Sequence, residues 1–299
     1  MRYRRFGQTG QSLSVFSLGT MRSLSGPEPL QRVVAAAWER GINHFETARG
    51  YGSSEAYLGQ ALRALQLPRA RYFLTTKLLP THDAARFETE LAESCARLQC
   101  DRVDFLAFHG INTWEHLQAV CQPQIQAAVA RARADGRIGH VGFSTHAPLE
   151  IVSAAIETGL FAFVNLHYYY FDRQLAPAIA LAAARDLGVF IISPADKGGR
   201  LYNPPAKLRQ LCAPFSPLTL TYRFLLGDRR ITTLSLGPAT PAELVAPLEV
   251  GDRDGPLAPA ERDTLARLEA ELRNQLGDDY CQQCRRCLPC PEAINIPAV

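Results

Sequence analysis

The chain has 299 residues, of which 47% are hydrophobic and 20% are charged, a composition typical of a globular protein rather than a disordered one. Its formal net charge of +3 is small for this length and argues against nucleic acid or an anionic membrane as a partner. We find no export signal after Met1, and no apolar run approaches the roughly 18 residues of a membrane span. We therefore expect a soluble, cytoplasmic protein.

The first predicted elements lie in residues 3–20, where YRRFGQTGQSLSVFSLGT predicts a short hairpin and then a strand that ends near Gly19. Helix and strand patterns alternate from there to residue 247. The predicted helices cover residues 30–40, 54–65, 84–98, 123–134, 148–158, 177–187, 205–212 with 218–226, and 241–247. The predicted strands between them cover residues 42–47, 72–78, 103–110, 140–145, 161–168, 189–194 and 231–237.

This alternation predicts an α/β protein with a parallel sheet, because strands that are apolar on both faces need helices to cover them. A closed (β/α)8 TIM barrel leaves no strand edge unpaired and suits the chain length. The alternative is an open doubly wound sheet, but the G-x-G-x-x-G motif that usually follows its first strand is absent. We assign residues 1–250 to the barrel with its N-terminal hairpin. Residues 251–299 form a C-terminal extension, with a helix at 258–276 and a cysteine-rich tail.

Polar side chains stand at the ends of the predicted strands, where a parallel barrel carries its active site. In chain order these residues are Glu46, Lys77, His109, Ser144, Thr145, Asn165, His167 and Ser193. Tyr51 follows Glu46 by five residues, in a glycine-flanked loop. A carboxylate, a lysine and a histidine after three successive strands, with a tyrosine between them, predict one shared active site.

The stretch from residue 45 to residue 59 reads FETARGYGSSEAYLG. It resembles the aldo-keto reductase family, in which a strand ends in Asp-Thr-Ala, a Tyr-Gly pair follows five residues after the Asp, and Ser-Glu and Leu-Gly come next. The resemblance covers about residues 1–250. It implies a (β/α)8 barrel, in agreement with the alternation of elements.

The resemblance also makes Tyr51 the proton donor, with Lys77 and His109 as its partners and Glu46 in the position of the family's aspartate. A tyrosine with a pKa of about 10 is poorly matched to proton transfer near neutral pH. A nearby ammonium group favours the phenolate, and a fall of two pKa units needs about 3 kcal/mol. We expect Lys77 to have this effect, Glu46 to hold Lys77, and His109 to orient a carbonyl oxygen.

The resemblance implies a nicotinamide cofactor, NADP or NAD. The residues that it assigns to this cofactor are Ser144 and Asn165 for the nicotinamide amide, and Ser193, Lys197 and Gly198 for the pyrophosphate.

Three features differ from the family pattern. Glu46 is one methylene longer than the usual aspartate. Ile192 stands where the family commonly places an aromatic ring against the nicotinamide. The segment LGPATPAEL, residues 236–244, lacks the Lys or Arg that members specific for the 2′-phosphate of NADP often have there. The choice between NADP and NAD therefore stays open.

Eight cysteines occur in the chain, and four of them crowd into ten residues of the tail, CQQCRRCLPCPEAINIP. These four are Cys281, Cys284, Cys287 and Cys290. Repeated C-x2-C spacing that ends in Cys-Pro is typical of iron-sulfur ligation, so we expect a [4Fe-4S] cluster, with zinc or another metal, or an empty thiol cluster, as alternatives. The tail also resembles the C-terminal extension of a ferredoxin-like subgroup of aldo-keto reductases.

We expect an NAD(P)H-dependent oxidoreductase that reduces the carbonyl of a small-molecule aldehyde or ketone. One alternative is an iron-sulfur protein for electron transfer or redox sensing, with an electron-transfer partner, on the same scaffold. Another is a nicotinamide-binding module with little catalytic activity. The sequence predicts neither the substrate nor the oligomeric state.

Overall fold

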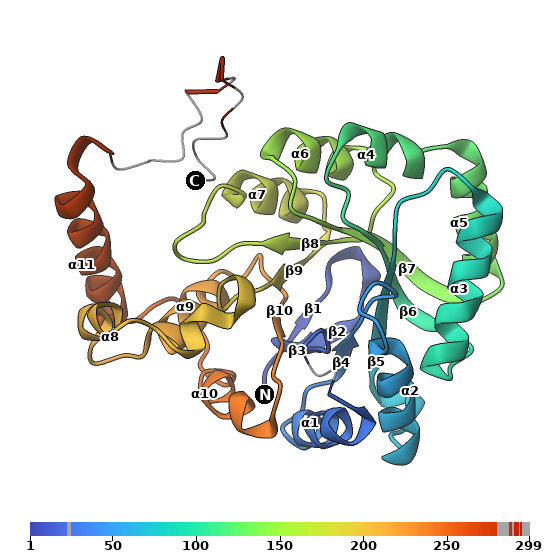
Figure 1. The fold of residues 1–299 in the computed structure, drawn as a ribbon, viewed down its shortest axis with the longest axis horizontal. Helices are drawn as coiled ribbons and strands as arrows, with labels where there is room; N and C mark the ends of the chain where they lie inside the picture. Colours follow the sequence, from blue (N-terminus) through green and yellow to red (C-terminus); the bar gives the residue numbers. More distant parts are fainter. Residues whose placement is uncertain (23–24, 280–286, 289, 293, 295–299) are drawn as a thin grey trace.

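The computed structural model describes residues 1–22, 25–279, 287–288, 290–292 and 294. Its centre is a closed barrel of eight parallel strands surrounded by helices (Figure 1). These strands are β3 (Phe16–Gly19), β4 (His44–Glu46), β5 (Phe73–Leu78), β6 (Val103–His109), β7 (Ile138–Thr145), β8 (Phe163–His167), β9 (Gly188–Ile192) and β10 (Thr233–Leu236). Each strand pairs with the next along the chain, and β10 closes the barrel against β3. The predicted TIM barrel is confirmed.

The helices cover the outside of the barrel and build a lobe beside it. They are α1 (Pro27–Glu39), α2 (Ser54–Ala64), α3 (Ala84–Leu98), α4 (Trp114–Val120), α5 (Pro123–Ala134), α6 (Leu149–Glu157), α7 (Ala176–Ala184), α8 (Ala206–Cys212), α9 (Pro217–Gly227), α10 (Val245–Leu248) and α11 (Pro259–Leu276). Short 3-10 turns are η1 (Gly7–Thr9), η2 (Arg69–Arg71), η3 (Lys197–Tyr202), η4 (Pro241–Leu244) and η5 (Gly277–Asp279). The sequence pattern does not predict α4, because this short helix buries only Leu117 and Val120.

The predicted N-terminal hairpin is present as β1 (Tyr3–Arg5) and β2 (Ser12–Ser14), which pair antiparallel. Phe6 follows β1 and fills the barrel at the N-terminal ends of its strands. Its ring centroid lies 5.2 Å from those of Phe105 and Phe163. A Cβ atom at Gly188 would lie 2.2 Å from the Phe6 ring, so only glycine allows this approach. Aromatic packing therefore closes the end of the barrel that lies away from the strand-end polar residues.

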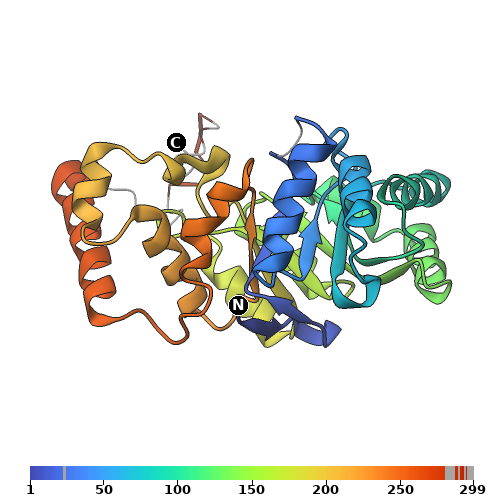
Figure 2. The same cartoon turned by 90° about the horizontal axis from the view of Figure 1, so that it is seen from below.

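The C-terminal helix α11 packs against α8, and with α9 these helices form a lobe beside the barrel (Figure 2). A buried ion pair joins α9 to α11, with Arg223 Nε donating to Glu261 Oε1 at 2.9 Å. The Tyr170 hydroxyl donates to the Leu265 carbonyl oxygen at 2.7 Å. Both contacts are shielded from water, so they hold α11 in a defined orientation.

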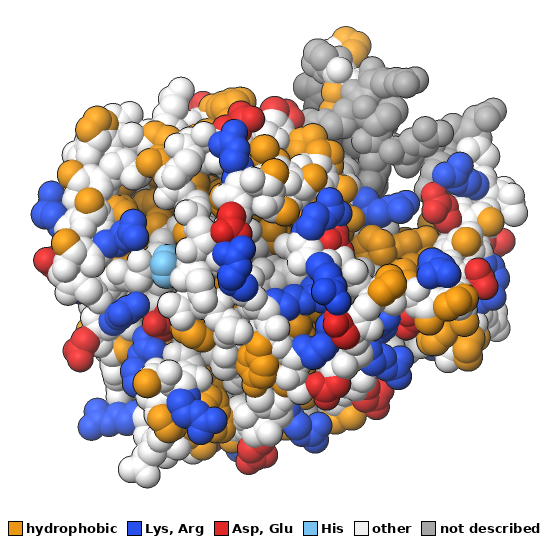
Figure 3. All heavy atoms as spheres, turned by 180° about the vertical axis from the view of Figure 1, so that it is seen from behind, with side chains coloured by type: hydrophobic (Ala, Val, Ile, Leu, Met, Phe, Trp, Pro, Cys, Tyr) orange, Lys and Arg blue, Asp and Glu red, His pale blue; other side chains and the backbone are white. Residues whose placement is uncertain are grey.

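The molecular surface carries charges of both signs. Lys and Arg side chains are mixed with Asp and Glu over the face drawn in Figure 3. Several arginines are paired with carboxylates, as Arg5 is with Asp186 and Arg137 with Glu88. Within the described residues, we find no helix with the length and apolar character that crossing a membrane requires.

Candidate active site

Parallel strand pairing brings the predicted strand-end residues to one end of the barrel. Glu46 is the last residue of β4, Lys77 is next to last in β5, and His109 is the last residue of β6. The strand register pairs His109 with Ser144, and Ser144 with Asn165. The barrel therefore collects polar side chains from five neighbouring strands at a single rim.

Tyr51 reaches this rim from the loop between β4 and α2. Gly52, with φ of 55°, takes the left-handed conformation that turns the loop back toward the helix. The loop is held at its base by Ser54, whose Oγ lies 2.6 Å from Thr20 Oγ1 and accepts a hydrogen bond from Thr47 Oγ1 at 2.8 Å. These buried hydroxyls tie the tyrosine loop to β3 and β4.

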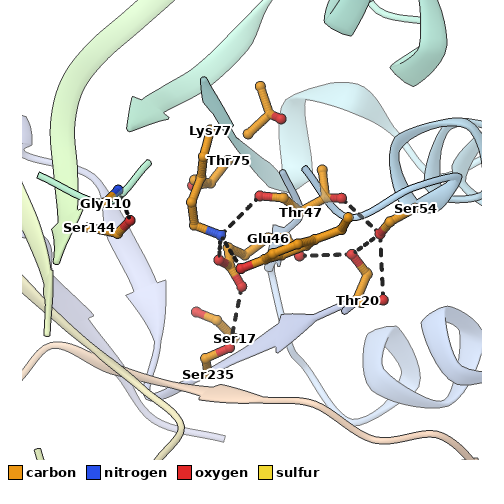
Figure 4. Close-up of polar contacts among 12 residues, drawn as sticks. Ser17, Thr20, Glu46, Thr47, Ser54, Thr75, Lys77, Gly110, Ser144 and Ser235 are labelled. Carbon is orange, nitrogen blue, oxygen red and sulfur yellow. Dashed lines mark hydrogen bonds and ion pairs between the residues drawn. The ribbon is translucent and has the colours of Figure 1, made fainter. Parts of the chain in front are cut away.

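Lys77 is the centre of the site (Figure 4). Its Nζ atom donates to one carboxylate oxygen of Glu46, to the Thr47 carbonyl oxygen at 3.1 Å, and to the Tyr51 hydroxyl at 3.1 Å. These three contacts use all three donors of an ammonium group. Lys77 is 1% exposed and Glu46 is 3% exposed. The lysine and the carboxylate therefore form a buried ion pair with the tyrosine hydroxyl at its side.

Burial acts on both members of the Tyr51–Lys77 contact. It raises the pKa of Tyr51 to about 12 and lowers the pKa of Lys77 to about 7. In each case burial favours the neutral form. The sequence-based expectation that Lys77 leaves Tyr51 with a lowered pKa considers the ammonium charge alone. In the folded protein, burial is the cause that moves the pKa of Tyr51, and it raises this pKa, so Tyr51 stays protonated at neutral pH.

His109 lies against Tyr51, with ring centroids 5.4 Å apart and planes at 87°. Burial, together with the positive charge of Lys77, lowers the pKa of His109 to about 4. The imidazole is therefore neutral near pH 7 and keeps one N–H group to donate. His109 and Tyr51 can thus offer two neutral hydrogen-bond donors to one oxygen atom.

Asn165 on β8 is completely buried, and neither its Nδ2 nor its Oδ1 atom has a hydrogen-bond partner among the described residues. Burying an amide without partners costs about 1–3 kcal/mol per group, so such a side chain indicates a ligand. Ser144 lies beside it, and its Oγ accepts from the Gly110 backbone N–H at 3.0 Å, which leaves its own hydroxyl proton to donate. Asn165 and Ser144 together can bind a primary amide.

A cavity of about 530 Å³ opens at this rim between the ends of β9 and β10. Its walls include Glu46 and Tyr51, and also Ser193, Lys197 and Gly198, which are three residues predicted for cofactor binding. Ser144 and Asn165 are not among the residues that line it. Gly198 has φ of 73°, a left-handed conformation that favours glycine in the turn η3. The cavity therefore connects the tyrosine to a glycine-containing loop with an exposed lysine.

The structure adds residues to the site that sequence reasoning missed. Gly19 on β3 and Ser235 on β10 line the cavity next to Glu46, and Tyr202 and Tyr222 form another part of its wall. Only Ser235 offered a signal, because it is a polar residue inside the apolar strand TLSL. Tyr202 ends the turn η3, outside every helix and strand that the sequence predicts, whereas Tyr222 lies on α9, within the predicted helix 218–226.

The cysteine tail is only partly described. Cys281 and Cys284 lie outside the described residues, whereas Cys287 is exposed and Cys290 is half-buried. Within the described part of the chain, no group of three or more His, Cys, Asp or Glu side chains is placed to hold a metal ion. The predicted iron-sulfur cluster therefore stays a prediction.

The fold is thus a parallel eight-stranded barrel with a tyrosine, a lysine, a histidine and a carboxylate at the rim where barrels of this kind carry their active sites. The model of the Aldo/keto reductase family matches residues 16–205, and the chain belongs to this family. The protein is accordingly an oxidoreductase.

Individual relatives agree with this assignment. L-galactose dehydrogenase of Arabidopsis thaliana is 30% identical, over 65% of this chain and 66% of the plant protein. An aldo-keto reductase of Mycobacterium sp. (strain KMS) is also 30% identical, over 65% of this chain and 68% of the relative. The holo form of aldo-keto reductase AKR11C1 from Bacillus halodurans superposes with a TM-score of 0.78 at 20% identity, covering 90% of this chain and 96% of the other. This last likeness concerns the fold.

Proposed function

We propose that the protein reduces the carbonyl group of a small aldehyde or ketone with NADPH or NADH, and that Tyr51 donates the proton. The observation that carries this proposal is the contact between the Tyr51 hydroxyl and Lys77 Nζ, 3.1 Å apart at the wall of the cavity. A protonated tyrosine beside a buried ammonium group is suited to give a proton to a developing alkoxide.

The cofactor assignment is supported by the buried amide of Asn165. A nicotinamide carboxamide has one carbonyl acceptor, which could bind Asn165 Nδ2, and one NH₂ donor, which could bind Asn165 Oδ1. These are the hydrogen-bond partners that the two atoms lack among the described residues. When bound, the reduced nicotinamide supplies a hydride to the carbonyl carbon and is itself oxidised. Ser193, Lys197 and Gly198 line the cavity where they would meet the pyrophosphate.

Residues of the chain then orient the carbonyl group and transfer the proton. Tyr51 and His109 donate hydrogen bonds to the carbonyl oxygen and orient it. As negative charge grows on that oxygen, the Tyr51 Oη proton moves to it, and Lys77 stabilises the phenolate left behind. Glu46 keeps Lys77 in place and favours its charged form, against the effect of burial.

The direct test is Tyr51→Phe, which removes the hydroxyl and keeps the ring. We expect carbonyl turnover to fall by about 10²- to 10⁴-fold, while the affinity for NADPH, measured by fluorescence titration, stays the same. Tyr57→Phe on α2 is the matched control. The substrate panel should contain aldehydes, ketones and, in the oxidative direction, L-galactose, the sugar in the name of the plant relative. Undiminished turnover in Tyr51→Phe would refute the role of Tyr51.

The cysteine tail supports a second, separate proposal, a [4Fe-4S] cluster, on the observation that four cysteines follow one another at intervals of three residues. Anaerobic purification followed by iron and sulfide analysis tests it. We expect about four iron and four sulfide per chain. Zinc without sulfide, or no metal, would contradict the cluster and leave the barrel proposal unaffected.

A further inference from the structure

The two oxygen atoms of the Glu46 carboxylate have different partners. Oε1 accepts from Lys77 Nζ, and Oε2 accepts from the Ser235 hydroxyl at 3.3 Å. Ser235 lies on β10, 189 residues further along the chain, and closure of the barrel between β10 and β3 brings it here. In Figure 4 the Ser235 side chain points toward the carboxylate from the side opposite Lys77. Within the described residues, Ser235 is the donor that the structure provides for Oε2.

Gly19 makes the space that this arrangement needs. It lies on β3, which pairs with β10 on one side and with β4 on the other. In the register of β3 and β4, Gly19 is the partner of Glu46. A Cβ atom at Gly19 would lie 2.5 Å from Ser235 Oγ and 3.1 Å from Glu46 Oε2. The first distance is shorter than real side-chain contacts, so any larger residue would displace the serine or the carboxylate. At this point, β3 thus contributes the space at Gly19, β10 contributes the donor Ser235, and β4 contributes the acceptor Glu46.

A glutamate needs such support more than a shorter carboxylate does. Its side chain has one more rotatable bond than aspartate, and fixing that bond costs conformational entropy. Lys77 Nζ is held on one side by Glu46 and on the other by the Tyr51 hydroxyl. A carboxylate that turned away from Lys77 would therefore also move the ammonium group relative to Tyr51.

We propose that Ser235 is a positioning residue for the reaction, and that its hydroxyl, in the space left by Gly19, holds the long Glu46 side chain on Lys77. The inference rests on the proposed function of Tyr51 and Lys77, and it adds a residue from the last barrel strand to the site. Ser235 acts through Glu46 and Lys77, and it has no contact with the reacting carbonyl in this scheme.

The first experiment compares Ser235→Ala with Ser235→Thr, which keeps the hydroxyl. We expect Ser235→Ala to lower kcat by about 10-fold, with KM for the carbonyl substrate changed less than twofold, and to move the alkaline limb of the pH–rate profile to lower pH. Ser235→Thr should restore most of kcat. Ser17→Ala is the matched control, since this buried serine bonds to His44 and Thr233, and it should leave the pH profile in place.

The second experiment is a double-variant cycle with Glu46→Asp. The shorter aspartate draws the carboxylate back from Lys77 or from Ser235. The serine can then no longer hold the carboxylate on Lys77. Ser235→Ala should therefore change kcat by less than about twofold in the Glu46→Asp protein. Equal losses in both backgrounds, or no loss in either, would overturn the proposal.

A third readout separates this inference from the proposed function. The protonation of Lys77 can be followed by NMR of its ε-carbon in protein labelled with 13C-lysine, without substrate or cofactor. Ser235→Ala should lower the pKa of Lys77, and Ser17→Ala should not. If carbonyl turnover survives in Tyr51→Phe, the proposed function fails. The Ser235 contact is then still tested by the titration, and an unshifted curve in Ser235→Ala would refute it.

Discussion

The Nζ atom of Lys77 lies 3.1 Å from the Tyr51 hydroxyl, and burial moves the pKa values of these two groups in opposite directions, to about 7 and about 12. A tyrosine is neutral when it is protonated, and a lysine is neutral when it is deprotonated. A raised pKa for Tyr51 and a lowered pKa for Lys77 therefore both favour the neutral form. Near pH 7 the tyrosine is therefore fully protonated, whereas the lysine is close to its midpoint. The charge state of Lys77, rather than that of Tyr51, should set the pH dependence of the enzyme.

We predict that kcat/KM for carbonyl reduction decreases as the pH rises above about 7. Lys77 loses its proton there, and the phenolate of Tyr51 loses the charge that stabilises it. On the acid side the profile should stay flat down to about pH 4, because His109 remains neutral above that value. Initial rates between pH 4 and 10 test this, with the stability of the protein checked at each pH. A rate that is still undiminished at pH 9 would contradict it.

Removing the buried lysine should destabilise the fold. The Glu46 carboxylate is 3% exposed, and in Lys77→Met it loses its counter-charge. Leaving a buried charge unpaired lowers the free energy of unfolding by about 3–5 kcal/mol. Urea denaturation should show this loss, and the double variant Lys77→Met with Glu46→Gln should recover most of it. Lys207→Met is the control, because the Lys207–Glu271 pair is on the surface and is worth less than about 1 kcal/mol. Equal effects of the two lysine variants would exclude a special role for the buried pair.

Asn165→Leu should separate cofactor binding from stability. Its amide has no partner among the described residues, so the substitution should leave the unfolding midpoint of the free protein unchanged or raised. The dissociation constant for NADPH or NADH should rise by about 10- to 100-fold, as expected for a lost pair of hydrogen bonds. Fluorescence titration and thermal unfolding measure the two effects, with Asn274→Leu on the exposed face of α11 as control. Unchanged cofactor affinity would argue against an amide-binding role.

His44 should make the protein sensitive to acid. It is completely buried between Ser17 and Thr75, and burial lowers its pKa to about 3 from an ordinary value of 6.5. Between these values the unfolded chain binds a proton that the folded protein rejects, so the stabilisation is complete above pH 6.5 and decreases as the pH falls. Over two pH units the loss is about 3 kcal/mol.

The replacement His44→Gln keeps hydrogen-bonding groups and removes this titration. Its unfolding free energy should fall less steeply than that of the wild type between pH 6.5 and 4.5, as followed by urea denaturation at several pH values. Parallel curves for the two proteins would show that His44 is not the responsible group.

The barrel was predictable from the sequence because the alternation of apolar strands and amphipathic helices persists through all eight units. The rim residues Glu46, Lys77 and His109 followed from the same pattern, since parallel strands carry their last residues to one end. The helix α4 was missed because so short a segment buries too few apolar residues to show a period. Local pattern thus predicts elements well when they are long and repeated.

The contacts of the site were less predictable. Gly19, Glu46 and Ser235 lie on three strands that the barrel closure brings together, and no local pattern reports such a contact. The pKa of Tyr51 was expected to fall through the charge of Lys77, whereas burial raises it. Burial depends on how the loops cover the rim, and a sequence pattern does not specify this cover.

The packing of Phe6 against Phe105 and Phe163 also has a kinetic consequence. With these aromatic rings filling one end of the barrel, the rim that carries Tyr51 is the end from which a cavity leads to the reacting groups. A nicotinamide and a carbonyl compound would then enter through a shared mouth, and the molecule that lies deeper must arrive first and depart last. Gly188, whose missing side chain lets Phe6 fill the floor of the barrel, thereby helps to leave the opposite end as the way in.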